Sequence, residues 1–148
     1  MRKHIERIAK QHDKVTFITD GSLGVAIWAF EEVHNFRVRE QDRKKDINNV
    51  MILPCVKHYA RWTPEQQKHI LHRIDYLATH VYYTDANYYT GGTQFYKCKE
   101  EIVAKVDGVI AVWDESEGMT EFVIGCAQGK GVPILGYNPK RQKQFSIK

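Results

Sequence analysis

The sequence predicts an α/β domain with three layers, in which helices cover both faces of a five-stranded parallel sheet. Short and nearly continuous apolar runs alternate with segments of helical periodicity along the 148 residues. This alternation is typical of strands that are linked by helices and buried on both faces. The segment 106–135 contains a complete strand, turn, helix and strand. We therefore expect one domain over residues 1–136, followed by a basic tail over residues 137–148.

Five apolar runs are the expected strands, each of the usual strand length: residues 15–19, 50–55, 80–84, 109–113 and 132–136. We expect the sheet order 80–84, 50–55, 15–19, 109–113, 132–136, so that the strands at 15–19 and 109–113 pair directly. A gap between these two strands would leave backbone N–H and C=O groups without partners.

The first two helices are predicted by apolar stripes at helical spacing. In the segment 1–11 the stripe contains Ile5, Ile8 and Ala9. In the segment 23–36 apolar residues recur at intervals of four, three and three, at Leu23, Ile27, Phe30 and Val33. Each helix should therefore pack one face on the sheet.

The later helices have start signals. The sequence Thr63-Pro64-Glu65-Gln66 is a capping box with proline at the first helical position, and it predicts a helix to about residue 78. Thr93 is expected to cap a helix whose stripe contains Phe95, Ile102 and Val106. The last helix is expected to begin at Gly118-Met119-Thr120.

The composition is that of an ordinary globular protein, with 43% hydrophobic residues and a net charge of +4. No apolar run approaches the ~20 residues that cross a bilayer. The first eleven residues, MRKHIERIAKQ, lack the apolar core of a secretory signal. Three cysteines without a CxxC pair suit free thiols in a reducing cytoplasm. We therefore expect a cytoplasmic protein without membrane contact.

The basic residues gather in the segment 37–46 and in the tail, where a solvated linker and a solvated end explain them. Nucleic-acid binding would need basic residues on one face with interleaved aromatic residues, so we do not expect nucleic acid as the partner. The charge does suit a small anionic ligand.

The first candidate site is the turn after the strand at 15–19, with Asp20, Gly21, Ser22, Leu23 and Gly24 as the expected ligand-binding residues. Glycine permits close backbone approach, and Ser22 is expected to cap the following helix and to offer its hydroxyl to a phosphate. The alternative is a tight strand–helix turn that binds nothing.

The second candidate site is the turn after the strand at 109–113. Its expected ligand-binding residues are Asp114, Gly118, Met119, Thr120 and Glu121. A helix that opens directly after a parallel strand offers unpaired N–H groups to an anion, and the carboxylates suit the hydroxyl groups of a ribose. The alternative is helix stabilisation by acidic residues in the first turn.

The third candidate region is the aromatic loop after the strand at 80–84, in which Tyr88 and Tyr89 could stack on a base. The alternative is that these tyrosines cover the edge of the core. His69 and His72 share a helix face, but no third residue is spaced to complete a metal site. We expect neither a metal nor a resident cofactor.

These motifs resemble a known family. The segment ITDGSLGVAIWAFE resembles the second-strand motif of the YpsA-like branch of the SLOG superfamily, whose Rossmann-like domains are related to the LOG and DprA proteins. VMILPC with the downstream Trp62 resembles the third strand of that branch. VDGVIAVWDESEGMTEFVIGCAQGKGVPI resembles its C-terminal unit. The resemblance covers residues 15–136 and implies a Rossmann-like fold with a pocket for nucleotides or ADP-ribose-like ligands, with Trp62 beside it.

The chain also departs from the family pattern. The usual first strand and its turn have no counterpart in it. Asp20 and Met119 stand where the family has glycine, and Cys98-Lys99 stands at about the place where relatives commonly have an Arg-Asn pair. LOG-type hydrolases carry a glutamate shortly after the threonine of the last turn, and Glu121 is one position early. A missing element leaves apolar surface to cover, so we expect a homodimer or a larger assembly with residues 82–96 near the interface.

The leading interpretation is a protein that binds a nucleotide-derived ligand, such as an ADP-ribose-type or cyclic nucleotide signal, without turning it over. Sequestration of such a signal, for example by a viral protein that counters a host defence, follows by analogy of fold alone. The second interpretation is a hydrolase or transferase that acts on an N-glycosidic bond, with Glu121 or Asp114 as the catalytic carboxylate. A structural or nucleic-acid-binding role comes third.

Overall fold

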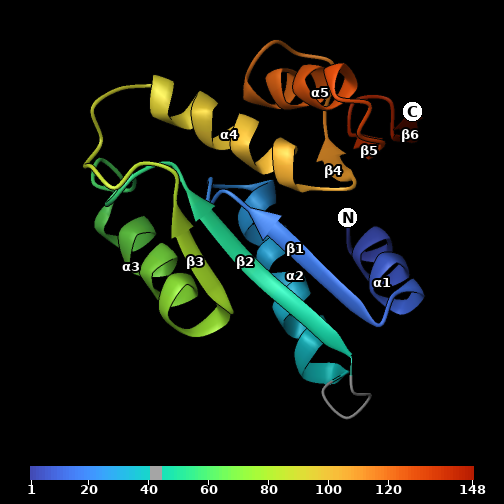
Figure 1. Cartoon of the computed structure of the whole chain (residues 1–148), viewed down its shortest axis with the longest axis horizontal. Helices are drawn as coiled ribbons and strands as arrows, with labels where there is room; N and C mark the ends of the chain where they lie inside the picture. Colours follow the sequence, from blue (N-terminus) through green and yellow to red (C-terminus); the bar gives the residue numbers. More distant parts are fainter. Residues whose placement is uncertain (41–44) are drawn as a thin grey trace.

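The computed structural model describes residues 1–40 and 45–148. Its elements follow one another in an alternating order (Figure 1): α1 (Arg2–Gln11), β1 (Lys14–Thr19), α2 (Val25–Arg39), β2 (Asp46–Leu53), α3 (Pro64–His72) with its π-helical continuation η2 (Arg73–Leu77), β3 (His80–Tyr83), α4 (Thr93–Lys105), β4 (Val109–Val112), α5 (Met119–Gly129), β5 (Ile134–Asn138) and β6 (Lys143–Ile147). No helix of the described residues is long and apolar enough to span a membrane.

The strands form two separate sheets, and the expected five-stranded parallel sheet is wrong. The first sheet has the order β1-β2-β3 and is parallel throughout. The second has the order β4-β5-β6, in which β4 and β5 are parallel. The pairings within each group agree with the expected order, but β1 and β4 do not pair. A cavity lies between them and is lined by every residue of both strands.

Strand β6 lies in the segment that was expected to be a basic tail. It runs antiparallel to β5, with Gly136 opposite Phe145. A Cβ atom on Gly136 would lie only 2.1 Å from the ring of Phe145, so glycine makes room for the ring. Phe145 and Ile147 pack against the core of the second sheet. Their alternation is the period-2 signal of a strand within a basic sequence.

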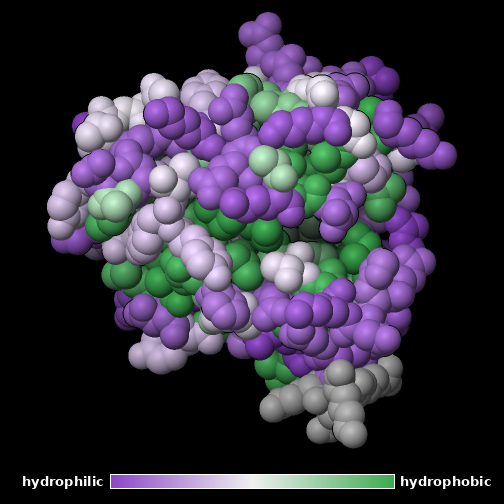
Figure 2. All heavy atoms as spheres, viewed as in Figure 1, coloured by the Kyte–Doolittle hydropathy of each residue, from purple (hydrophilic) through white to green (hydrophobic). Residues whose placement is uncertain are grey.

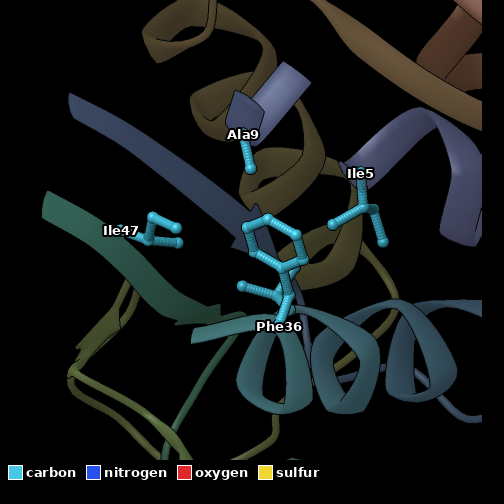
Figure 3. Packing of buried hydrophobic residues seen from close by; sticks show 5 residues of the cluster. Ile5, Ala9, Phe36 and Ile47 are labelled. Carbon is cyan, nitrogen blue, oxygen red and sulfur yellow. The ribbon is translucent and has the colours of Figure 1, made fainter. Parts of the chain in front are cut away.

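The core follows the alternation of β2, whose side chains point to opposite faces of the first sheet. Met51 and Leu53 pack with residues of α2 and α3 on one face. Val50 and Ile52 pack with Cys98 of α4 on the other. A third cluster on the α1–α2 side joins Ile5, Ala9, Val33, Phe36 and Ile47 (Figure 3). The three expected layers are therefore present around the first sheet.

Helix α4 connects the two sheets (Figure 1). Its Cys98 packs against β2, whereas its Val103 packs with Ala111 of β4 and Ile124 of α5. One helix of the described residues therefore packs against both sheets, although the strands of the two sheets do not pair with one another.

The helix starts differ in how well the sequence predicted them. The capping box at Thr63 is confirmed. The Thr63 hydroxyl accepts from the backbone N–H of Gln66, and the side-chain oxygen of Gln66 accepts from the backbone N–H of Thr63. Thr93 does not cap α4, which begins at Thr93 after an N-cap at Gly92. Ser22 does not cap α2, whose N-cap is Gly24.

Candidate functional site

The turn after β1 is organised around the carboxylate of Asp20, which is 5% exposed. Its Oδ1 accepts from the backbone N–H of Ser22 at 3.2 Å, and its Oδ2 accepts from the Ser22 hydroxyl and from Lys99 Nζ. The Ser22 hydroxyl donates its hydrogen bond to Asp20 within the turn and does not cap α2. The turn is therefore a closed hydrogen-bonded loop with a lysine attached from α4.

Lys99 and Asp20 form a largely buried ion pair, because the Lys99 side chain is only 15% exposed. Burial by itself would raise the pKa of Asp20, but the ammonium group of Lys99 and the hydrogen bonds from Lys99 and Ser22 outweigh it and hold the pKa below its usual value. The carboxylate is therefore ionised, and the ammonium group of Lys99 balances its charge.

Gly21 is a packing residue of this turn. Its φ is +70°, and a Cβ atom there would lie 2.7 Å from Leu53 Cδ2 and 3.2 Å from Met51 Sδ. Only glycine lets the backbone lie this close to the buried strand β2. Gly21 does not line the cavity between β1 and β4.

His58 lies behind Gly21 and is 5% exposed. Its ring meets the rings of Tyr59 and Trp62 edge to face, with centroids 5.3 and 5.2 Å away. Burial lowers the pKa of His58, although the Gly21 backbone and the Asp20 carboxylate oppose this shift. A neutral imidazole therefore lies under the first turn.

The carboxylates of the second turn are engaged by neighbouring groups. Asp114 accepts from the backbone N–H and the hydroxyl of Ser116 and pairs with Lys140 Nζ at 2.9 Å. The bonds from Ser116 and then from Lys140 hold the pKa of Asp114 far below its usual range. Glu115 pairs with Arg141 in the same way. These two ion pairs link the turn after β4 to the segment between β5 and β6.

Two helix N-termini open without a capping side chain. The N-cap residues of α2 and α5 are Gly24, with φ +90°, and Gly118, with φ +141°, and neither end has a side-chain cap hydrogen bond. The first N–H groups of each helix have no partner within the helix. Val25, Met119 and Thr120, which belong to these first turns, line the cavity. Unpaired amides and the positive ends of the helix dipoles favour an anion there.

Residues of both turns line the same cavity, which has a volume of about 1240 Å³. Those from the two turns and from the neighbouring part of α4 are Asp20, Ser22, Leu23, Lys99, Met119 and Thr120. Together they offer an ammonium group, two hydroxyls, a carboxylate and apolar surface. This set can hold a phosphate and a ribose hydroxyl side by side.

Several expected residues lie elsewhere. Glu121 is exposed on α5 and, like Asp114, does not line the cavity. Trp62 packs beside His58 and the core of the first sheet. Tyr88 is 63% exposed with Lys57 Nζ 5.7 Å from its ring centre, and Tyr89 has the guanidinium of Arg61 at 5.0 Å. These aromatic residues form a second, separate region.

Lys99 and His58 are the two site residues that the sequence reasoning missed. Lys99 did have a signal: positions 95, 99, 102 and 106 follow one another at helical spacing, so Lys99 lies on the apolar stripe of α4. A lysine on a buried face needs a partner. His58 had no such signal, because only the tertiary structure brings it under Gly21. No group of three residues that could hold a metal ion occurs among residues 1–40 and 45–148.

A family model described as the YspA SLOG family, YpsA, matches residues 1–131. The chain is 28% identical over 109 residues to a UPF0398 protein of Macrococcus caseolyticus, and this alignment covers 71% of this chain and 55% of that protein. It is 26% identical over 125 residues to the UPF0398 protein YpsA of Bacillus subtilis, and this alignment covers 79% of this chain and 65% of that protein. The chain thus spans less than two thirds of the length of these relatives.

Proposed function

Because the chain belongs to the YspA SLOG family, we propose that it binds a nucleotide-derived ligand, of the ADP-ribose or cyclic nucleotide type, and does not turn it over. The observation that supports the proposal is that both turns line one cavity, the first with Asp20 and Ser22 and the second with Met119 and Thr120. Two open helix N-termini and a lysine on the same cavity suit a phosphate group.

Each group has a role in this proposal. The phosphate lies at the N-terminus of α5, where the first amides, the Thr120 hydroxyl and Lys99 can reach it. Asp20 already accepts from Ser22 and Lys99, and a carboxylate has about four lone-pair positions. It therefore retains capacity for one ribose hydroxyl.

Binding without turnover is supported by the positions of the two candidate catalytic carboxylates. Cleavage of an N-glycosidic bond needs a positioned acid or carboxylate at the reacting centre. Glu121 is exposed outside the cavity, and Asp114 is held by Ser116 and Lys140. We therefore propose sequestration or sensing of a signal, including the capture of a defence signal by a viral protein, ahead of hydrolysis or transfer.

We also propose a cytoplasmic homo-oligomer. The cysteines at positions 55, 98 and 126 are free thiols, which suits a reducing compartment. Tyr82, Tyr88 and Tyr96 are between 47% and 63% exposed and provide an apolar surface for self-association.

The test is calorimetry with ADP-ribose and a cyclic ADP-ribose isomer as ligands. Thr120→Glu should abolish binding, because it places a carboxylate where the phosphate lies. Thr93→Glu is the matched control, since it puts the same charge at the start of α4 outside the cavity, and it should bind like the wild type. Equal affinity of the Thr120 variant would refute this site.

Turnover is tested on the same samples. The ligand should be recovered intact by mass spectrometry after heat denaturation. Release of free base or ribose phosphate that is lost in Glu121→Gln would instead show an N-glycosidic-bond enzyme.

A further inference from the structure

His58 is a buried histidine that packs against the back of the first turn, residues 20–24, and does not line the cavity. Its Nε2 would lie 3.5 Å from a Cβ atom on Gly21, so the ring contacts the backbone of the turn directly. Neither ring nitrogen makes a hydrogen bond of good geometry to any residue in 1–40 or 45–148. Buried polar side chains are nearly always hydrogen-bonded, so these two nitrogens need an explanation.

The imidazole ring is held in place by aromatic and apolar neighbours. Tyr59 and Trp62 meet it edge to face, with centroids 5.3 and 5.2 Å away. Both pack on the apolar cluster that contains Met51 and Leu53 of β2, and the same two side chains of β2 lie against Gly21. Ring, turn and strand therefore form one packed unit. Among these neighbours the turn is the one outside the apolar cluster, so it is the part that can move.

The charges around the ring are balanced while the ring is neutral. The charged group that acts on His58 is Asp20, which is already paired with Lys99 of α4. On the loop of the ring itself, burial raises the pKa of Tyr59, so this phenol is neutral, and Lys57 is exposed. One carboxylate and one ammonium group give a buried cluster without net charge, and an imidazolium would make it positive.

A net charge in such surroundings is costly unless water or a partner reaches it. Figure 2 shows hydrophobic side chains across the middle of the molecule, the part in which β1 ends in Figure 1. Few polar groups are therefore at hand to stabilise an imidazolium. Burial also lowers the pKa of His58, as expected for a ring that accepts a proton only after the turn has moved off it and admitted water.

We propose that His58 is the positioning residue of the first turn, and that its neutral ring supports the closed turn whereas its protonation opens the turn and weakens ligand binding. The part that concerns the ligand rests on the proposed function, in which Asp20 meets a ribose hydroxyl. The closed turn orients this carboxylate through Ser22 and Lys99. Because the ligand binds the closed turn and the proton binds the open one, each weakens the binding of the other.

Backbone amide exchange tests the turn without any ligand. The amide of Ser22, which donates to Asp20 in the closed turn, is compared at pH 7.5 and pH 5.5, each time relative to an unstructured chain at the same pH. In the wild type its protection should fall at least about fivefold at the lower pH, while that of residues 50–53 in β2 stays unchanged.

His58→Phe keeps a neutral ring at both pH values, and His58→Gln keeps a polar side chain without a titrating proton. In neither variant should the protection of the turn depend on pH. A wild type without the fall, or a fall of equal size in both variants, would overturn the inference.

Calorimetry with ADP-ribose tests the consequence for binding, since the pyrophosphate of this probe keeps its charge between the two pH values. The wild type should bind at least about fivefold more weakly at pH 5.5 than at pH 7.5, because a smaller fraction of the chain has the closed turn. His58→Phe should bind equally well at both. Equal wild-type affinity at the two pH values, or the same loss in His58→Phe, would contradict the role of the ring.

His4→Gln is the matched control. His4 is 7% exposed and its pKa is also lowered by burial, but it lies on α1 and does not line the cavity. This variant should keep the wild-type pH dependence in both measurements, and its loss there would assign the effect to general destabilisation and overturn the inference. Failure of ADP-ribose to bind at either pH would refute the proposed function instead, and amide exchange would still decide whether His58 controls the turn.

Discussion

Lys99 of α4 forms an ion pair with Asp20 at the end of β1, and their side chains are only 15% and 5% exposed. The pair joins the turn of the first sheet to the helix that also packs on the second sheet. It therefore contributes to the shape of the candidate site as well as to its charge.

Lys99→Met should destabilise the protein by about 3–5 kcal/mol, because it leaves a buried carboxylate without its partner. Adding Asp20→Asn should recover most of this loss, since the remaining side chain is then neutral. Lys105→Met is the matched control on the same helix: its exposed pair with Glu101 is worth about 0.5 kcal/mol or less. Urea unfolding measures all three, and a Lys99 variant as stable as the control would contradict the buried pair.

His58 should make stability fall as the pH drops below about 6.5, the ordinary histidine value. Its folded-state pKa is lowered by burial, so below this pH the unfolded chain takes up a proton that the folded chain refuses, and the free energy of unfolding decreases. His58→Gln should reduce this dependence between pH 7 and 5, and the remainder should come from His4, whose pKa is also lowered by burial. An unchanged slope in that variant would show that other groups cause it.

Asp20 should also make the free energy of unfolding fall as the pH drops, but in a lower pH range than His58. Its depressed pKa contributes stability that is fully present above about pH 3.9 and is lost as the pH falls through the folded-state value. Comparing wild type with Asp20→Asn by unfolding below pH 4 separates this effect from that of His58.

Gly21→Ala should cost more stability than Gly24→Ala. Both positions have positive φ, and a residue other than glycine held in such a backbone region costs about 1–3 kcal/mol. Only at Gly21 does the added Cβ meet buried side chains, those of Leu53 and Met51, whereas at Gly24 nothing lies within 4 Å. We expect a further loss of about 1–3 kcal/mol from overpacking. Equal melting temperatures for the two variants would contradict the close packing of this turn on β2.

The protein should form a homodimer or larger assembly through residues 82–96. Light scattering at micromolar concentration should give more than a monomer mass, and Tyr82→Lys with Tyr96→Lys should lower it, because charges replace exposed apolar surface. Tyr76→Lys is the control, since Tyr76 is 73% exposed outside this region. A monomer mass for the wild type would rule out self-association at that concentration.

The sequence by itself determined the family and most of the elements, although it missed β6. Helical and strand periods and the capping box at Thr63 are local signals, because each depends on residues a few positions apart. The pairings β1-β2-β3 and β4-β5 agree with the strand order expected from the sequence. The match of residues 1–131 to the YspA SLOG family agrees with the motifs read from the turns.

Only the tertiary structure decided whether β1 and β4 meet, and which side chains share the site. The cavity between β1 and β4 depends on how α4 packs on both sheets, and this contact joins residues far apart in the chain. The same packing brings Lys99 to Asp20, while the fold of β2 and the following loop brings His58 under Gly21. Such contacts depend on three-dimensional packing, and no local spacing in the sequence encodes them.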